Sequence, residues 1–422
     1  MDLSTDFGRT RYLRPQQVVT ATRREDILTA FDLARKLDAP ITVRASGHSC
    51  NGQTLSDGVV VYNRLETTEI KFLGDGLVQI PARSTWRAVE TALNRHGLKA
   101  PVITDYLATT VGGTLSVGGI GLNSIVNGFQ IDNVARLELL RPVQGPTWCS
   151  PSEHPDLFRA ALGGLGQVGV IESVVIQAHP YKRFCHTVKR AHPSLRHLLD
   201  TLPPLTEPGS GVDHLHGYFR GENYFTEFGY YSDSPQTDRK RYPEAWLGKN
   251  PEWSVVADLP FAMHDKRDLW LNAFQDHFRV WVDYVFDYEN FCAFLADFEP
   301  LLESEPLNQS ARGISILLAR RRPDAVPFIL APTPPGEMLY GFGSYFMLSR
   351  WNPHQLTRTV AALNQALELC ARHHGRPYLY GAHPMEQVLK LGFFNEGLPL
   401  LRRLRTESCG GLRLNPIGLD GP

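Results

Sequence analysis

The stretch Arg44–Gln53, RASGHSCNGQ, places one histidine in a turn made of small residues. An apolar run, ITV at residues 41–43, precedes this turn, and another, VVVY at residues 59–62, follows it. Short apolar runs beside glycine-containing turns are typical of strands, so His48 is expected on a loop between two strands. Three roles are possible for this histidine: a loop residue without a specific function, a metal-binding or catalytic residue, or a covalent anchor for a cofactor.

A second segment, TVGGTLSVGGIG at residues 110–121, contains five glycines. Glycine at this density raises the entropic cost of ordering the backbone, but it lets the backbone come close to a bound group. The apolar residues between the glycines, such as Val111 and Leu115, are not typical of a flexible, solvated linker. The segment is therefore expected to lie against a cofactor phosphate or ring.

A third stretch, LGGLGQVGVI at residues 162–171, contains the spacing Gly-x-Gly-x-x-Gly. In a Rossmann fold this spacing follows a strand and opens a helix. Here the helical pattern PDLFRAAL comes before the glycines, and the strand-like run VIESVVIQ comes after them. The order is reversed, and we therefore reject a Rossmann NAD site.

The order of expected elements separates the chain into two regions. Before residue 185, short strands alternate with helices, which is typical of an α/β or α+β domain. After it, the aromatic stretches GYFRGENYFTEFGYY at residues 217–231 and FRVWVDYVFDYENFCAFLADF at residues 278–298 predict strands of an antiparallel domain. A long amphipathic helix is expected over residues 353–375.

Composition limits the possible partners. The 422 residues include 43 basic and 44 acidic side chains, so net charge argues against nucleic acid as a partner. The N-terminus has no apolar signal segment, no apolar run is long enough to span a membrane, and six scattered cysteines form no CxxC pair. We expect a cytoplasmic protein without metal, since His214-x-His216 has no evident third ligand.

Three motifs together resemble a known family. GHSCNGQ, TDYLATTVGGTLSVGGIG and LGGLGQVGVI are similar to the PCMH-type FAD-binding module of the vanillyl-alcohol oxidase superfamily, and within it to cytokinin dehydrogenases. The resemblance implies an α+β fold with a two-subdomain FAD-binding domain at residues 1–183. It further implies an inserted α+β substrate domain built on an antiparallel sheet at residues 184–380, and a C-terminal return to the FAD-binding domain at residues 381–422.

The same resemblance implies that FAD is bound through a single covalent link to a ring nitrogen of His48. A second link is not expected, because no cysteine occurs in Ala108-Thr109-Thr110. Tyr378 competes with Tyr380 for one flavin contact, and Asn415-Pro416 departs from the family's serine-proline and glutamine ending. The other residues implied to contact FAD are Ala45, Ser46, Gly47, Ser49, Gln53, Thr110, Gly113, Ser116, Ile120, Ile171, Tyr380 and Asn415.

The resemblance also implies the chemistry. Asp105 matches the base that accepts a proton while hydride leaves a C–H next to an amine nitrogen, and its apolar neighbours Ile103 and Leu107 are expected to desolvate it. Glu227 is either a second active-site acid or the polar face of a strand, and Trp281 either lines the pocket or packs in the core. The expected partners are a small-molecule substrate and oxygen or a quinone, and the expected state is a monomer or homodimer.

Two rival functions stay open at this stage. The same flavin module could serve an alcohol or ring-forming oxidase of bacterial secondary metabolism, because the substrate domain sets specificity. A catalytically silent binding protein is the alternative from another class. Retention of both His48 and Asp105 disfavours that reading.

Overall fold

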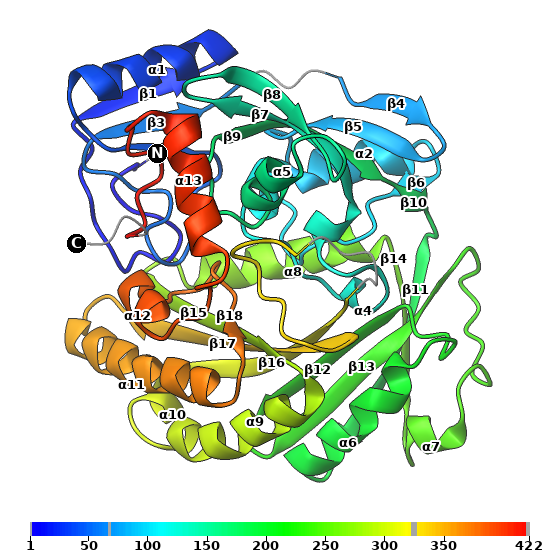
Figure 1. Ribbon diagram of the computed structural model, residues 1–422. Helices are drawn as coiled ribbons and strands as arrows, with labels where there is room; N and C mark the ends of the chain where they lie inside the picture. The colour runs from blue at the N-terminus through cyan, green and yellow to red at the C-terminus, as the bar shows by residue number, and fades with distance from the viewer. Residues whose placement is uncertain (1, 66–68, 322–326, 419–422) are drawn as a thin grey trace.

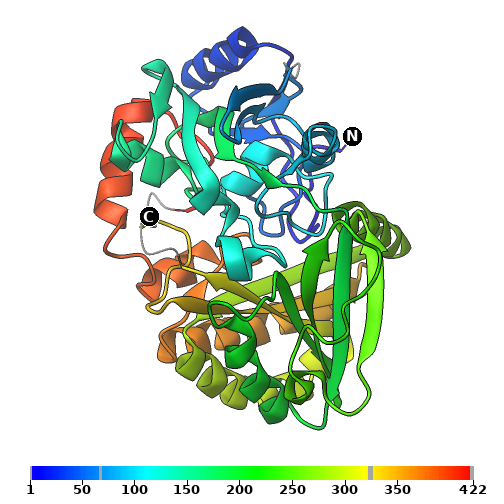
Figure 2. The same cartoon turned by 90° about the vertical axis from the view of Figure 1, so that its right-hand side faces the viewer.

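The computed structural model describes residues 2–65, 69–321 and 327–418. Two regions lie one above the other in Figures 1 and 2: the N-terminal region together with the last helix, and a large twisted sheet with its own helices. Helices and mainly antiparallel sheets are mixed throughout, which confirms the α+β class. No helix in the described ranges is long and apolar enough to cross a membrane.

The first unit is a parallel three-stranded sheet in the order β1-β3-β2, covered by helix α1. Ile27, Ala30, Phe31 and Ala34 recur at helical spacing and are fully buried against it. The C-terminal segment joins this unit, because the backbone N–H of Asn415 donates to Ile41 O at 2.7 Å. The bounds are β1 Gln17–Ala21, α1 Arg24–Lys36, β2 Ile41–Arg44 and β3 Val59–Asn63.

The second unit is an antiparallel five-stranded sheet in the order β4-β5-β9-β7-β8. Its strands are β4 Lys71–Gly74, β5 Leu77–Pro81, β7 Val134–Arg141, β8 Gly145–Cys149 and β9 Val170–Gln177. The short strands β6 Leu98–Lys99 and β10 His179–Pro180 pair beside it. Its helices are α2 Trp86–Asn94, α3 Val111–Leu115, α4 Ser124–Asn127, the 3-10 helix η1 Gln130–Asn133 and α5 Pro155–Ala161.

The third unit is an antiparallel eight-stranded sheet in the order β14-β11-β13-β12-β16-β17-β15-β18. It runs from Phe184 to Pro377, and the expected boundaries at residues 183 and 380 stay predictions. Its strands are β11 Phe184–His192, β12 His214–Arg220, β13 Asn223–Ser232, β14 Glu252–Ala257, β15 His277–Phe286, β16 Ala311–Arg320, β17 Met338–Ser349 and β18 Arg376–Pro377.

Helices cover the two faces of this sheet unequally. Helices α6, α9, α10 and α11 lie on the face away from the N-terminal region, and α8 lies on the side toward it (Figure 1). The face toward the N-terminal region is thus left to line a cavity. The helix bounds are α6 Leu195–Thr206, α7 Glu244–Leu247, α8 Leu259–Ala273, α9 Tyr288–Glu303, α10 Leu307–Ser310, α11 Pro353–Arg372, α12 Met385–Lys390 and α13 Leu398–Cys409.

One element differs from the sequence expectation. Residues 288–298, which were expected to form a strand, belong to helix α9. The buried Phe291, Phe294 and Phe298 recur at intervals of three and four, which is a helical period. Asp287 caps the helix by accepting a hydrogen bond from the Asn290 N–H at 3.0 Å. Aromatic content alone therefore gave a wrong prediction of a strand, because the spacing of the buried residues changes to a helical period at this point.

Candidate functional site

A cavity of about 680 Å³ lies between the N-terminal region and the large sheet. All of the residues that the sequence analysis proposed for cofactor, substrate or catalysis line it. They are Ala45, Ser46, Gly47, His48, Ser49, Gln53, Asp105, Thr110, Gly113, Ser116, Ile120, Ile171, Glu227, Trp281, Tyr380 and Asn415. The fold thus brings together residues that lie up to 370 positions apart in the chain, while their individual roles stay predictions.

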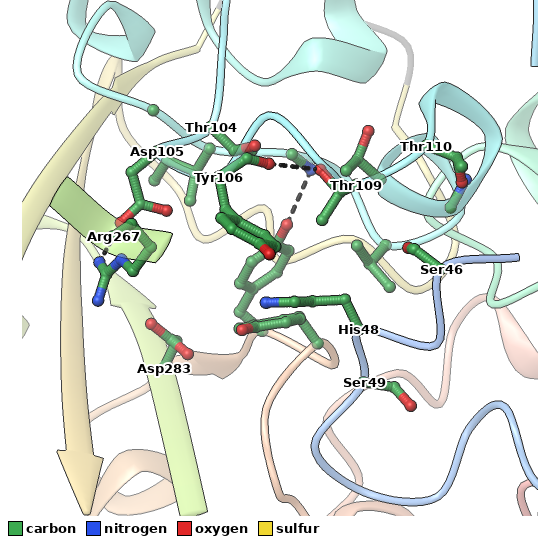
Figure 3. Close-up of a pocket in the computed structure, with 18 of the residues that line it drawn as sticks. Ser46, His48, Ser49, Thr104, Asp105, Tyr106, Thr109, Thr110, Arg267 and Asp283 are labelled. Carbon is green, nitrogen blue, oxygen red and sulfur yellow. Dashed lines mark hydrogen bonds and ion pairs between the residues drawn. The ribbon is translucent and has the colours of Figure 1, made fainter. Parts of the chain in front are cut away.

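His48 lies in a stack of rings at the centre of the site (Figure 3). Its imidazole stacks on Phe7 with ring centroids 3.9 Å apart, and Tyr106 and Tyr380 follow at 5.1 and 6.3 Å. Burial lowers the pKa of His48 to about 4, so the ring is neutral at physiological pH. Its Nε2 is shielded and has no hydrogen-bond partner within the described part of the chain.

The N-terminal segment holds the His48 loop from outside. Asp6 accepts hydrogen bonds from the Ser49 hydroxyl and the Gly52 N–H, both at 2.8 Å. Gly47 has a φ of 69° and its carbonyl accepts from the Phe7 N–H at 3.0 Å. Among described residues, the N–H groups of Gly47 and Ser49 have no acceptor. Such N–H groups on a tight turn form a site for an anion.

The glycine segment forms the neighbouring wall. Thr110 caps helix α3 by accepting from the Gly113 N–H at 3.3 Å, and the chain then turns at Gly118 and Gly119 with φ of 125° and 74°. The Gly119 N–H donates to the Tyr378 hydroxyl at 2.8 Å. Tyr378 therefore fixes the glycine segment, whereas its rival Tyr380 stacks on the His48 ring.

Two of the proposed cofactor contacts use their amides within the protein. Gln53 donates to Leu379 O at 3.0 Å and accepts from the Asn51 N–H at 2.9 Å. Asn415 accepts from the Val43 N–H at 3.1 Å and donates to Gly166 O at 2.8 Å. Both side chains border the cavity, and their bonds hold the C-terminal segment against the His48 loop and the third glycine turn.

Asp105 does not have the expected environment. Its side chain is 40% exposed and forms an ion pair with Arg267 of α8 (Figure 3). The apolar neighbours Ile103 and Leu107 point into the core and are buried, so they do not enclose the carboxylate. The expected desolvation of Asp105 is therefore wrong, because burial belongs to its sequence neighbours and the carboxylate faces a guanidinium.

The large sheet contributes side chains at every second position of its strands. On β15, Trp281 is 5% exposed, its ring centroid lies 4.8 Å from that of Tyr345, and its neighbour on the same face is Asp283. On β12 and β13, His216 and Glu227 are paired across the two strands and both border the cavity. Burial lowers the pKa of His216. Within the described residues, no group of three His, Cys, Asp or Glu could hold a metal.

Sequence reasoning missed several residues of the cavity. Asp283 could have been found, because alternation along β15 places it on the same face as Trp281. Burial raises the pKa of Asp283 to about 7, and the charge of Asp105 adds to the effect. Arg267 lies on a helix without a clear apolar stripe, and Tyr345 lies on a strand that is buried on both faces. Neither has a signal in the sequence.

Comparison with known proteins agrees with this geometry. The model of a family described as FAD binding domain matches residues 15–147, which include the His48 loop, Asp105 and the glycine segment. Residues 15–147 are thus similar to an FAD-binding domain, and the expected resemblance to FAD-binding proteins and cytokinin dehydrogenases is confirmed for this part of the chain.

The relatives cover less of the molecule. An uncharacterized oxidoreductase in the fasciation locus of Rhodococcoides fascians is 38% identical over 172 residues, which are 41% of this chain and 39% of that protein. Cytokinin dehydrogenase 6 of Oryza sativa subsp. japonica is 35% identical over 200 residues, which are 45% of this chain and 38% of that protein. Cytokinin dehydrogenase 3 of Arabidopsis thaliana is 38% identical over 175 residues, which are 40% of this chain and 34% of that protein. The chain thus matches less than half the length of these relatives.

Proposed function

We propose that the protein is an FAD-dependent oxidoreductase that removes hydride from a C–H next to an amine nitrogen. Its similarity to proteins named cytokinin dehydrogenase supports the proposal. The observation that carries the proposal is the neutral imidazole of His48. Its unpartnered Nε2 lies in the same cavity as the glycine segment and Asp105. A neutral ring nitrogen has a lone pair, which a covalent link to FAD requires.

The residues present fit FAD. The unsatisfied N–H groups of Gly47 and Ser49 would hold the pyrophosphate, and the glycine segment leaves room for close approach of the flavin. One covalent link through His48 is proposed, because Ala108 to Thr110 offer no cysteine. When bound, FAD supplies a two-electron acceptor for the hydride of the substrate, and oxygen or a quinone is proposed to take the electrons afterwards.

Side chains of the protein would accept the proton, contact the substrate and exclude water. Asp105 accepts the N–H proton of the substrate, and its ion pair with Arg267 orients the carboxylate. Trp281 and Tyr345 offer aromatic faces to a flat substrate. Tyr106 and Phe7 pack against the His48 ring and shield it from water.

An alcohol or ring-forming oxidase is the second candidate. The sheet face carries His216, Glu227 and Lys189, and such ionisable groups suit a more polar substrate than an apolar side chain on nitrogen. This face lies outside the family match at residues 15–147. The flavin chemistry would be the same for both candidates.

The test is anaerobic mixing of the purified protein with isopentenyladenine, followed by a quinone dye and analysis of the products. The proposal expects bleaching of the flavin and release of adenine. If no N6-substituted adenine bleaches the flavin while an alcohol does, the second candidate replaces the first. A colourless protein that cannot be loaded with FAD would favour a silent binding protein.

A further inference from the structure

A buried carboxyl group in the cavity has no place in the chemistry above. Asp283 lies on β15 and borders the cavity, and within the described chain its side chain forms no hydrogen bond or ion pair. Its Oδ2 is shielded from solvent. An unpaired buried carboxylate is strongly disfavoured, and a buried carboxylic acid without a partner also loses hydrogen bonds. A ligand would supply the missing partner.

The opposite strand is built to leave room for this side chain. Gly343 of β17 is the direct cross-strand neighbour of Asp283. A Cβ atom at residue 343 would stand 2.7 Å from Asp283 Oδ1 and 3.2 Å from the Tyr345 hydroxyl. Any other residue would displace the carboxyl group. The glycine therefore leaves free the space that the Asp283 carboxyl group occupies.

The two carboxyl groups of the site have different environments. Figure 3 shows Asp105 and Asp283 on opposite sides of Arg267, with both carboxyl groups directed toward the same space. Asp105 is partly exposed and forms an ion pair with Arg267, and an ion-paired carboxylate accepts hydrogen bonds. Burial and the charge of Asp105 raise the pKa of Asp283 to about 7, so a large share of it is a carboxylic acid at neutral pH.

We propose that Asp283 binds the substrate by donating a hydrogen bond from its carboxylic acid, opposite the Asp105 carboxylate that accepts the substrate's proton. This deepens and rests on the proposed function. The substrate then carries a donor N–H and an acceptor lone pair on one edge. With aromatic rings such as Trp281 and Tyr345 beside the acids, a flat amino-substituted nitrogen heterocycle fits this pair.

The protonation states of other titratable groups around Asp283 do not change between pH 6 and 8.5. Burial raises the pKa of Tyr345, Tyr378, Tyr380 and Cys50 above their ordinary values, and Asp283 adds to each shift. These four stay neutral. Arg267 on α8 has a raised pKa and stays charged, and His48 stays neutral. A change in ligand affinity over this range is therefore assigned to Asp283.

The first experiment is independent of turnover. Infrared spectra of the FAD-loaded protein at pH 6 and pH 8.5 are compared between wild type, Asp283→Asn and Ser344→Ala. Ser344 is buried next to Gly343 and does not border the cavity, so it controls for general disturbance of β17. We expect a carboxylic acid C=O band at pH 6 that weakens at pH 8.5 and persists in Ser344→Ala. In Asp283→Asn the band should be smaller, because only other buried acids such as Glu90 still contribute to it. Identical spectra of wild type and Asp283→Asn would overturn the proposal.

The second experiment measures binding of adenine, a probe that cannot be oxidised, by its perturbation of the flavin spectrum. Wild type should bind about tenfold more weakly at pH 8.5 than at pH 6, because a donor becomes an acceptor. Asp283→Asn keeps a hydrogen-bond donor and should bind adenine equally at pH 6 and pH 8.5. Asp283→Leu and Gly343→Ala should bind adenine weakly at both pH values. Wild-type affinity in Asp283→Leu, or no binding of adenine to wild type, would overturn the proposal.

The failure of each proposal has its own signature. If isopentenyladenine does not bleach the flavin but the infrared band and the adenine profile are as expected, the amine oxidation is wrong and the Asp283 donor stands. If isopentenyladenine bleaches the flavin and Asp283→Leu binds adenine normally, the oxidation stands and the donor is wrong.

Discussion

The two walls of the cavity are built in different ways. On the wall from the N-terminal region, backbone turns and amides determine the shape, and Gln53 and Asn415 have hydrogen-bond partners within the protein. On the wall from the large sheet, individual side chains determine the chemistry. The Asp283 carboxyl and the Trp281 Nε1 on that wall lack partners among the described residues.

This difference indicates a division of labour. A wall whose turns are held by internal hydrogen bonds is preorganised before a ligand arrives, and the free His48 Nε2 then stands at a fixed position, which suits a permanently held cofactor. A wall with unsatisfied polar groups gains those bonds when a ligand binds, which suits a substrate that must be discriminated from others. We expect substitutions on the first wall to affect stability and flavin retention, and substitutions on the second to affect turnover.

The largest effect is expected for Asp105→Asn, at the point where the two walls meet. Loss of a general base lowers rates by about 10²–10⁴-fold, so flavin reduction should slow by this factor while FAD stays bound. Stopped-flow measurement of flavin bleaching checks it, with Arg196→Gln on α6 as control, because Arg196 is exposed and pairs with Asp200 of the same helix. An unchanged rate would rule out Asp105 as the base.

The next effect concerns stability and pH. Asp283 has a pKa raised to about 7 in the folded protein, so the folded state retains a proton that the unfolded chain loses above about pH 4. The free energy of unfolding therefore falls as pH rises from about 4 to 7, by about 4 kcal/mol for this group. In Asp283→Asn this decrease in the free energy of unfolding with rising pH should be absent. Denaturant unfolding at several pH values measures it.

A matched variant separates the cavity from the fold. Burial raises the pKa of Glu90 in α2 to about 7 as well, and Glu90 lies away from the cavity. Glu90→Gln should remove a similar pH dependence of stability without changing adenine binding. If Asp283→Asn leaves the pH dependence of unfolding as it is in wild type, the side chain is not a buried acid.

A smaller effect is expected from Gln53→Ala on the first wall. The variant leaves the Asn51 N–H and the Leu379 carbonyl without their partners, which costs about 1–3 kcal/mol of unfolding free energy. Retention of FAD during gel filtration should fall. Gln79→Ala is the control, because Gln79 donates to Ser173 within the five-stranded sheet. Equal flavin loss in both variants would contradict a special role for Gln53.

The sequence predicted one wall better than the other for a physical reason. The first wall depends on short glycine turns, and a turn is encoded by a few adjacent residues such as Gly47 and Gly119. The second wall depends on strands that are paired only in the fold, so Glu227 and Trp281 came from resemblance. Asp283 could have been inferred from alternation on β15, whereas Arg267 required knowledge of where α8 lies.

The central claim is that the His48 imidazole holds FAD in the cavity that Asp105 borders. Mass spectrometry of the peptide containing His48, from wild type and from His48→Ala, tests it most directly. The account predicts one flavin adduct on His48 in wild type and none on any peptide of His48→Ala. Unmodified His48 in a fully flavin-loaded wild-type protein, or an adduct on another residue, would contradict the account.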